Sequence, residues 1–176
     1  MNRRRTFAIV CLVTVMIIWG STFVVTKAAA RDIPPLTLAA LRFLIAAIVL
    51  VPLALHRGGV WRLPQPIPWR ALILMAVTGI AAFAIAFNYA LVYGSAAQGA
   101  LIYALVPAAV ALAAVWFLKE GPSRQRVFGI VLSIIGVVLV ASGGESSLAA
   151  PRPLLGALWM LGAVTAWTAY TVLAKQ

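Results

Sequence analysis

The sequence is poor in the residues on which most catalytic and metal sites depend. Its 176 residues include one cysteine, one histidine and three acidic residues. Cys11 has no second cysteine with which to form a disulfide or a cysteine-based metal site. His56 lies in a loop between apolar runs, and Asp32, Glu120 and Glu145 lie at the ends of such runs, so no carboxylate pair, triad or metal cluster can be assembled. We therefore expect no enzyme activity, no metal and no cofactor.

The chain also has too few charged residues for a protein dissolved in water. Charged residues make up 10% of it and hydrophobic residues 64%, whereas about half of an ordinary soluble domain is apolar. The solvent for most of the chain must therefore be lipid. A net charge of +11 would suit nucleic acid, but the basic residues fall between the apolar runs instead of on one face. We expect a bilayer as partner and no nucleic acid.

The fold class that this pattern predicts is all-α, a polytopic membrane helix bundle with six transmembrane helices. A spanning helix needs roughly 20 predominantly apolar residues. Prolines, glycines and polar residues separate the runs that qualify. Gly94 and its small neighbours leave room only for a tight hairpin between the third run and the fourth. The six runs cover about residues 6–29, 36–55, 69–93, 95–118, 124–141 and 154–175.

The basic residues beside these runs predict the orientation of the chain in the cytoplasmic membrane. Flanks on the cytoplasmic side are enriched in lysine and arginine. With a cytoplasmic N-terminus, the outer flanks hold only Lys27, Arg31 and Arg152, and Arg42 lies inside a span. All the others then lie on the inner side: Arg3, Arg4, Arg5, Arg57, Arg62, Arg70, Lys119, Arg124, Arg126 and Lys175.

A short stretch of the first run returns in the last. Residues 19–27 (WGSTFVVTK) and 167–175 (WTAYTVLAK) share Trp, Val and Lys at matching positions, 148 positions apart. The first helix runs outward and the sixth inward, so the copies have opposite orientations, which is typical of inverted repeats in secondary transporters. Chance similarity of two apolar helices is the alternative. The copy also argues against a cleaved signal peptide at the N-terminus.

These pieces together resemble the EamA-like branch of the drug/metabolite transporter superfamily. The residues that carry the resemblance are 19–23 (WGSTF), 40–43 (ALRF), 105–120 (LVPAAVALAAVWFLKE) and the glycine-spaced run from Gly129 to Gly136. The resemblance implies ten helices in two inverted five-helix repeats that move small metabolites such as amino acids.

In this resemblance, residues 1–145 form the first repeat with five transmembrane helices. Residues 146–176 form a linker and the first helix of a truncated second repeat. We expect either a fragment of a ten-helix protein or a six-helix protein that forms a homo-oligomer to complete a pathway.

Two basic residues could serve a substrate. An ionisable residue within a span is a functional candidate by default. Arg42 lies about two turns into the second run, roughly 9 Å from its outer end. It could bind a substrate carboxylate, snorkel outward or pair with backbone carbonyls. Lys27 is closer to the outer boundary, where snorkelling is easier.

Polar residues on neighbouring helices complete a candidate cavity. Trp19, Thr22 and Thr26 fall on one face of the first helix, although helix packing explains that face nearly as well. The amides of Asn88 and Gln98 must find partners in a dry interior. Tyr103 joins this set, and Pro107 should kink the fourth helix and free a carbonyl. The expected substrate-binding residues are Trp19, Thr22, Thr26, Arg42, Asn88, Gln98, Tyr103 and Pro107.

The predicted function is a secondary transporter that exports small metabolites by alternating access. No carboxylate lies within a span, which argues against proton-coupled exchange of cationic drugs. A cavity with Arg42, and with Lys27 as a possible addition, suits an anionic or zwitterionic substrate. The alternative is a non-transporting truncated membrane protein or an assembly partner that needs oligomerisation.

Overall fold

Every element in the described part of the chain is a helix. The computed structural model describes residues 3–56, 68–119, 121, 123–142 and 150–175. This confirms the all-α fold class predicted from the sequence. The elements, of which η2 is a π-helical turn, are α1 (Arg3–Ala29), α2 (Pro35–His56), α3 (Trp69–Met75), η2 (Ala76–Ala82), α4 (Phe83–Tyr93), α5 (Ala96–Tyr103), α6 (Val106–Leu118), α7 (Arg124–Ser142) and α8 (Pro153–Leu173).

Five helical stretches of the described residues are long and apolar enough to cross a membrane. They are Arg5–Ala29, Pro35–His56, Trp69–Tyr93, Ala96–Phe117 and Pro153–Leu173, and each coincides with a predicted span. The predicted fifth span corresponds to α7, which has 19 residues but holds only a shorter apolar stretch, Val127–Gly136. This sixth crossing stays a prediction. The expected boundary between repeats, at residues 145 and 146, lies outside the described residues, as do Arg57 and Arg62.

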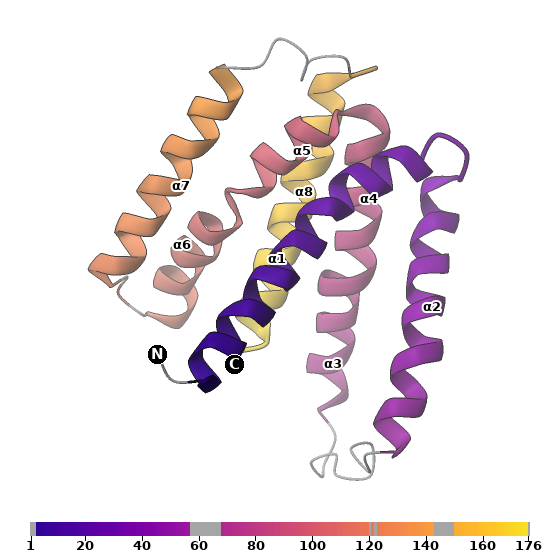
Figure 1. Ribbon diagram of the computed structural model, residues 1–176, viewed down its shortest axis with the longest axis horizontal. Helices are drawn as coiled ribbons and strands as arrows, with labels where there is room; N and C mark the ends of the chain where they lie inside the picture. The colour runs from indigo at the N-terminus through magenta and orange to yellow at the C-terminus, as the bar shows by residue number, and fades with distance from the viewer. Residues whose placement is uncertain (1–2, 57–67, 120, 122, 143–149, 176) are drawn as a thin grey trace.

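The helices run alternately up and down through the bundle. Figure 1 shows α1 beginning and α8 ending at the same end of the molecule, so these two helices run in opposite directions. The same end holds the start of α3 and the start of α7, whereas the opposite end holds the turn between α1 and α2 and the start of α8. The basic residues assigned to one side of the membrane therefore lie at the same end of the bundle, wherever the structure describes the helix end beside them.

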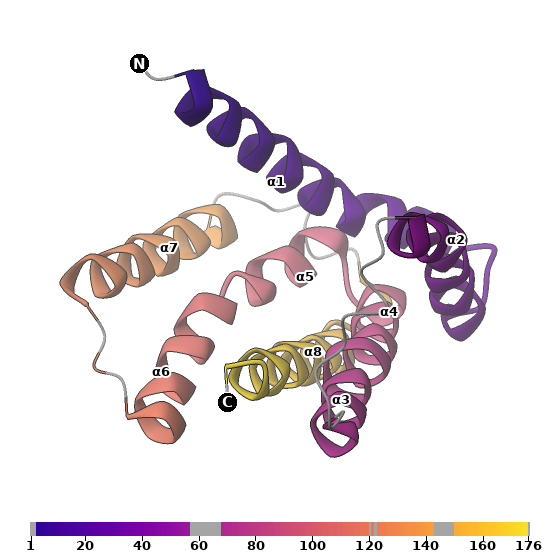
Figure 2. The same cartoon turned by 90° about the horizontal axis from the view of Figure 1, so that it is seen from below.

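The packed centre of the bundle lies between α4 and α8, which stand side by side in Figures 1 and 2. Their contact buries small and flexible side chains, and small residues let helix backbones approach closely in a membrane. A Cβ on Gly156 would lie 2.5 Å from the Cα of Gly94, so only glycine fits there. The buried cluster consists of Ala86, Phe87, Ala90, Leu91, Met160 and Ala163.

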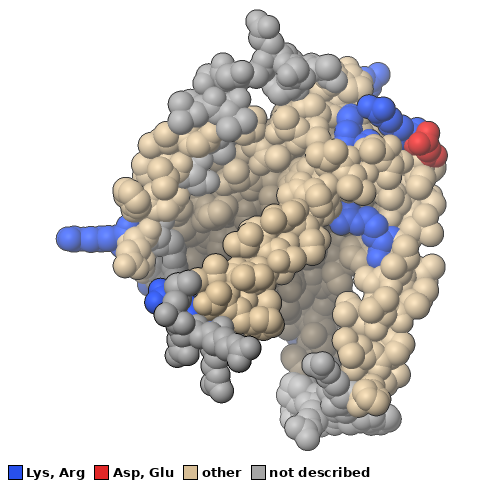
Figure 3. All heavy atoms as spheres, in the orientation of Figure 1, with Lys and Arg blue, Asp and Glu red and all other residues tan. Residues whose placement is uncertain are grey.

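The outer helices present apolar side chains to the surroundings. Phe7 is 72% exposed and Leu12 is 60% exposed on α1. Lysine and arginine occupy only small patches of the face seen in Figure 3. In a bilayer, lipid tails cover such surfaces.

Two irregularities interrupt the spans that line the centre. The fourth span breaks at Ala104 and Leu105 into α5 and α6, and Pro107 lies in the first turn of α6, where its missing N–H costs little. The kink predicted from Pro107 corresponds to this break, whereas the carbonyl it was expected to free stays a prediction. The third span carries η2, which the sequence did not predict, and such π-turns are frequent at functional sites.

Candidate functional site

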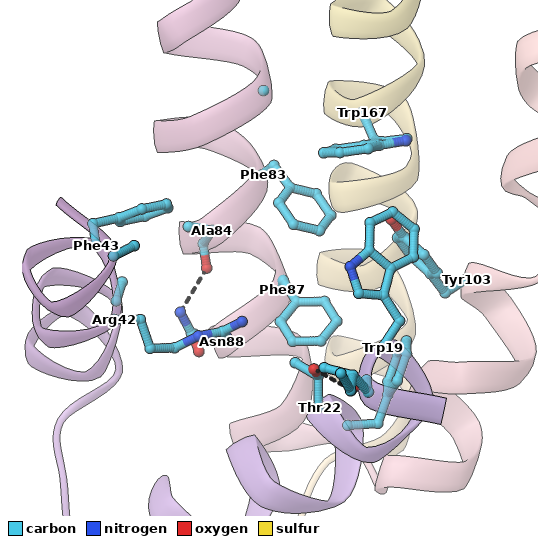
Figure 4. Close-up of a pocket in the computed structure, with 15 residues that line it drawn as sticks. Trp19, Thr22, Arg42, Phe43, Phe83, Ala84, Phe87, Asn88, Tyr103 and Trp167 are labelled. Atoms are coloured by element: carbon cyan, nitrogen blue, oxygen red, sulfur yellow. Dashed lines mark hydrogen bonds between the residues drawn. The ribbon is translucent and has the colours of Figure 1, made fainter. Parts of the chain in front are cut away.

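A cavity of about 470 Å³ opens between the helices, a volume that suits a small-molecule ligand. α1, α2, η2, α4, α5 and α8 all contribute to its wall. Figure 4 shows the labelled side chains converging on this space from separate helices. The lining residues are Ile18, Trp19, Thr22, Phe23, Ala39, Arg42, Phe43, Ala46, Gly79, Phe83, Ala84, Phe87, Asn88, Tyr103 and Trp167.

One side of the cavity is an aromatic wall, which we define as Trp19, Phe23, Phe83, Phe87, Tyr103 and Trp167. The rings of Trp19 and Trp167 meet edge to face with centroids 6.0 Å apart. Phe83 lies 5.1 Å from Trp167 by the same measure. Such ring pairs stabilise one another beyond the area they bury. The two tryptophans at matching positions of the repeated stretch therefore meet in the cavity wall.

Arg42 supplies the positive charge of the cavity. It extends from α2, and its Nη1 donates a long hydrogen bond of 3.4 Å to Thr26 Oγ1. Asp32 is the one acidic residue among the described residues, and it lies in the turn after α1. Within that part of the chain Arg42 has no carboxylate partner, so its donors are available to an anion.

Asn88 supplies an unpaired acceptor. Its side chain is 1% exposed, and Nδ2 donates to the Ala84 carbonyl at 2.9 Å. Its Oδ1 has no hydrogen-bond partner. A buried acceptor without a donor is costly, so such an oxygen calls for an explanation. The oxygen is covered in this structure, so a ligand in the cavity can reach it only after the side chain moves.

Lys27 lies apart from the cavity lining. Its Nζ donates to the backbone carbonyls of Leu91 at 2.7 Å, Val92 at 3.3 Å and Gly94 at 2.7 Å. An ammonium group has three protons, and all three are engaged here. Of the alternatives left open for Lys27, the structure does not place it in the cavity lining, because carbonyls of Gly94 and of the C-terminal end of α4 bind its ammonium group.

The structure brings together some of the predicted site residues and separates others. Trp19, Thr22, Arg42, Asn88 and Tyr103 line the cavity. That they bind a substrate stays a prediction.

Three predicted residues lie outside the lining. Thr26 is buried beside Arg42 and accepts its hydrogen bond. Gln98 lies in the first turn of α5, where its Nε2 donates to the Pro153 carbonyl at 2.9 Å and links α5 to α8. Pro107 follows the helix break, in the first turn of α6, and is exposed.

Sequence reasoning missed several lining residues. Phe83 and Phe87 lie four positions apart in α4, and Ala84 and Asn88 share that face, so helical spacing from Asn88 could have found them. Trp167 was marked by the repeated stretch but was not assigned to the cavity. Gly79 in η2 carried no signal, because a π-turn has no sequence pattern comparable to a cap.

Apolar helices around a cavity lined by aromatic and polar side chains define the class of this protein, a multi-span membrane protein. The family model described as the EamA-like transporter family matches residues 6–142. The chain belongs to this family, as the resemblance in its motifs suggested.

Similar proteins carry the name of transporter. An uncharacterized transporter of Archaeoglobus fulgidus is 29% identical over 94% of this chain and 56% of its own length. YetK, an uncharacterized transporter of Bacillus subtilis, is 28% identical over 96% of this chain and 51% of its own length. YedA, an uncharacterized inner membrane transporter of Escherichia coli, is 32% identical over 77% of this chain and 44% of its own length. The chain spans about half the length of these curated relatives, and no solved structure matches it.

Proposed function

We propose that this chain forms the substrate site of a secondary transporter that exports small anionic or zwitterionic metabolites, such as amino acids. The main observation behind this proposal is that Arg42, Asn88 and the aromatic wall line the same cavity. The match to a transporter family supports a transport function rather than an enzymatic one.

The charge of Arg42 supports an anionic group on the substrate. A cation within a span is expensive unless it is paired. A guanidinium offers two parallel donors that match a carboxylate. Because Arg42 has no carboxylate partner in the described part of the chain, an arriving substrate carboxylate completes its coordination.

The other lining residues favour a substrate that has a hydrogen-bond donor and an apolar part. The unpaired Oδ1 of Asn88 accepts a proton from an ammonium or hydroxyl group. The oxygen is covered in this state, so binding of the donor requires the Asn88 side chain to move. The aromatic wall then surrounds the apolar part of the substrate.

Alternating access is supported by the geometry of the repeated stretch. α1 and α8 run in opposite directions, and their matching tryptophans touch at the cavity. Sites between inverted repeats, exposed in turn to either side by rocking of the repeats, are the common plan of secondary transporters. This proposal includes further helices that complete a second repeat; of that repeat, the described residues include only α8.

We propose the cytoplasmic membrane as the location, with the N-terminus inside. The basic flanks of the helices support this orientation. A relative of this chain is named an inner membrane transporter.

The test is uptake of radiolabelled amino acids and their deaminated acids into everted membrane vesicles containing the chain. Arg42→Ala is expected to lower the uptake of the transported compounds roughly 10- to 100-fold, because charge-assisted hydrogen bonds are lost. Arg42→Lys should keep part of it. The control is Arg70→Ala, which removes an exposed charge at the start of α3, away from the cavity.

Unchanged uptake and substrate range in Arg42→Ala would refute the assignment. The alternative is a non-transporting membrane protein or an assembly partner that needs oligomerisation, because the chain covers about half of its relatives' length. Absence of uptake above empty vesicles for every compound, with the protein folded and inserted, would favour that alternative. A homo-oligomer would then appear on cross-linking in the membrane.

A further inference from the structure

The C-terminal end of α4 has a complete set of hydrogen bonds. The last carbonyls of a helix lack partners within the helix and carry negative partial charge. Carbonyls that the fold covers at this end need donors from elsewhere in the protein, and the bonds to Lys27 are part-buried. The Ala90 carbonyl accepts from the Gly94 N–H at 2.7 Å, and the Tyr93 carbonyl accepts from the Arg152 N–H at 3.0 Å.

The three remaining carbonyls converge on a single group. Leu91, Val92 and Gly94 form what we call the carbonyl cage, and its oxygens lie 2.7, 3.3 and 2.7 Å from Lys27 Nζ. Three protons meet three acceptors. No carboxylate takes part in these three bonds, so the cage holds positive charge with neutral oxygens alone.

We propose that the carbonyl cage is a binding site for a small primary ammonium cation and that the ammonium of Lys27 is its tethered occupant. Its three N–H donors match the three carbonyl acceptors, and backbone carbonyls can replace the hydration shell of a cation. Transporters place coupling cations at helix C-terminal ends and unwound carbonyls. Here α1 supplies the cation covalently, so the site is filled without an ion from solution. The proposal concerns this site alone and does not depend on the substrate of the cavity.

The carbonyl cage lies where three helices meet, so the bound ammonium links them. Through Lys27 it joins α1 to the turn between α4 and α5. The same turn holds the start of α8 through the Tyr93 carbonyl and through Gln98, whose Nε2 donates to Pro153. The ammonium therefore holds α1 to the place where the hairpin meets α8. Without it, three oxygens are left without a donor.

The experiment is chemical rescue of Lys27→Ala in the full chain, with thermal unfolding in detergent as readout. The substitution removes the ammonium together with its stem and leaves space for a free ion. We expect the Tm to fall by roughly 5 °C in sodium chloride, a shift typical of losing a few hydrogen bonds in a chain of this size. Methylammonium chloride at the same ionic strength should restore most of the loss, saturably. Tetramethylammonium chloride, which has no N–H donor, should restore none.

Two further variants act as controls. Arg31→Ala removes an exposed positive charge one turn away, so it should show neither the fall nor the rescue. Lys27→Met fills the path of the stem without a charge, so methylammonium should rescue it less than Lys27→Ala.

A Tm equal to that of the parent chain, or an equal response to all three salts, would overturn the proposal. If Lys27→Ala cannot be purified in sodium chloride, its yield of monodisperse protein is compared in the two organic salts. Recovery in methylammonium alone supports the cation site, and equal recovery, or recovery in neither salt, contradicts it. Vesicle uptake tests the cavity separately, so failure of one proposal leaves the other standing.

Discussion

Arg42 and Lys27 show how two similar residues acquire different tasks. Both are basic residues within or at the end of apolar runs, and by sequence either could meet a substrate. In the structure Lys27 gives its three protons to the α4 carbonyls, whereas Arg42 has one long hydrogen bond to Thr26. The difference lies in the acceptors that each one meets: Thr26 on the preceding helix for Arg42, and carbonyls 64 to 67 residues away in the chain for Lys27.

Asn88 permits a test that separates function from stability. Its Oδ1 lacks a partner, and leucine has a similar size without the polar atoms. We expect Asn88→Leu to raise the Tm by roughly 2–4 °C, because an unpaired buried acceptor is removed. Vesicle uptake of the transported compounds should fall at least about tenfold, because the hydrogen bond to the substrate is lost.

The control for Asn88→Leu is Thr165→Val. Thr165 is exposed on α8 and its hydroxyl is already paired with the Leu161 carbonyl, so uptake should not change. A lower Tm for Asn88→Leu would mean that the amide serves the fold instead.

At the scale of the helix, the contact between α4 and α8 depends on glycine. An added Cβ at Gly156 meets backbone atoms of Gly94 at 2.5 Å, and backbone cannot move aside as a side-chain tip can. The same helix carries Gly162, whose added Cβ would meet only Ala86 Cβ at 3.8 Å, an ordinary contact.

We therefore expect Gly156→Ala to lower the Tm by roughly 5–10 °C, a size typical of overpacking in a chain of this length. Gly162→Ala should leave the Tm unchanged or slightly higher, because alanine favours the helix. Thermal unfolding of both variants in the same detergent makes the comparison. Equal effects of the two substitutions would show that the close approach does not control stability.

The break between α5 and α6 could be predicted from the sequence, whereas the π-turn η2 could not. Pro107 predicts an irregularity, because its ring and missing N–H disturb a helix at that point. Pro52, which lies inside the continuous helix α2, shows that the packing around a proline decides whether the helix breaks. The π-turn at Ala76–Ala82 contains no such residue. Within it, Gly79 faces the ring of Tyr170 from α8.

For the whole molecule, the basic flanks predict which ends face the cytoplasm. In a Cys11→Ser background, a cysteine is introduced by Pro151→Cys before α8 or by Gln125→Cys in the first turn of α7, both at exposed positions. A membrane-impermeant maleimide applied to spheroplasts should label Pro151→Cys at once. It should label Gln125→Cys only after permeabilisation, because Gln125 lies at the end where α1 begins. Labelling in the reverse order would place the N-terminus outside.

The sequence by itself determined the solvent, the helical class, most of the spans and the family. These follow from hydropathy and short motifs, which are properties of neighbouring residues and do not depend on the rest of the fold. It also indicated that the repeated stretches run in opposite directions, because direction follows from counting spans.

Only the tertiary structure decided which side chains share the cavity. It brings Trp19 into contact with Trp167 and directs the Lys27 side chain to the carbonyl cage. It leaves Gln98 and Pro107 outside the cavity lining. The rotation of each apolar helix about its axis determines these contacts. In a helix that is apolar on every side, hydropathy gives almost no signal for that rotation, so the contacts with distant helices set it.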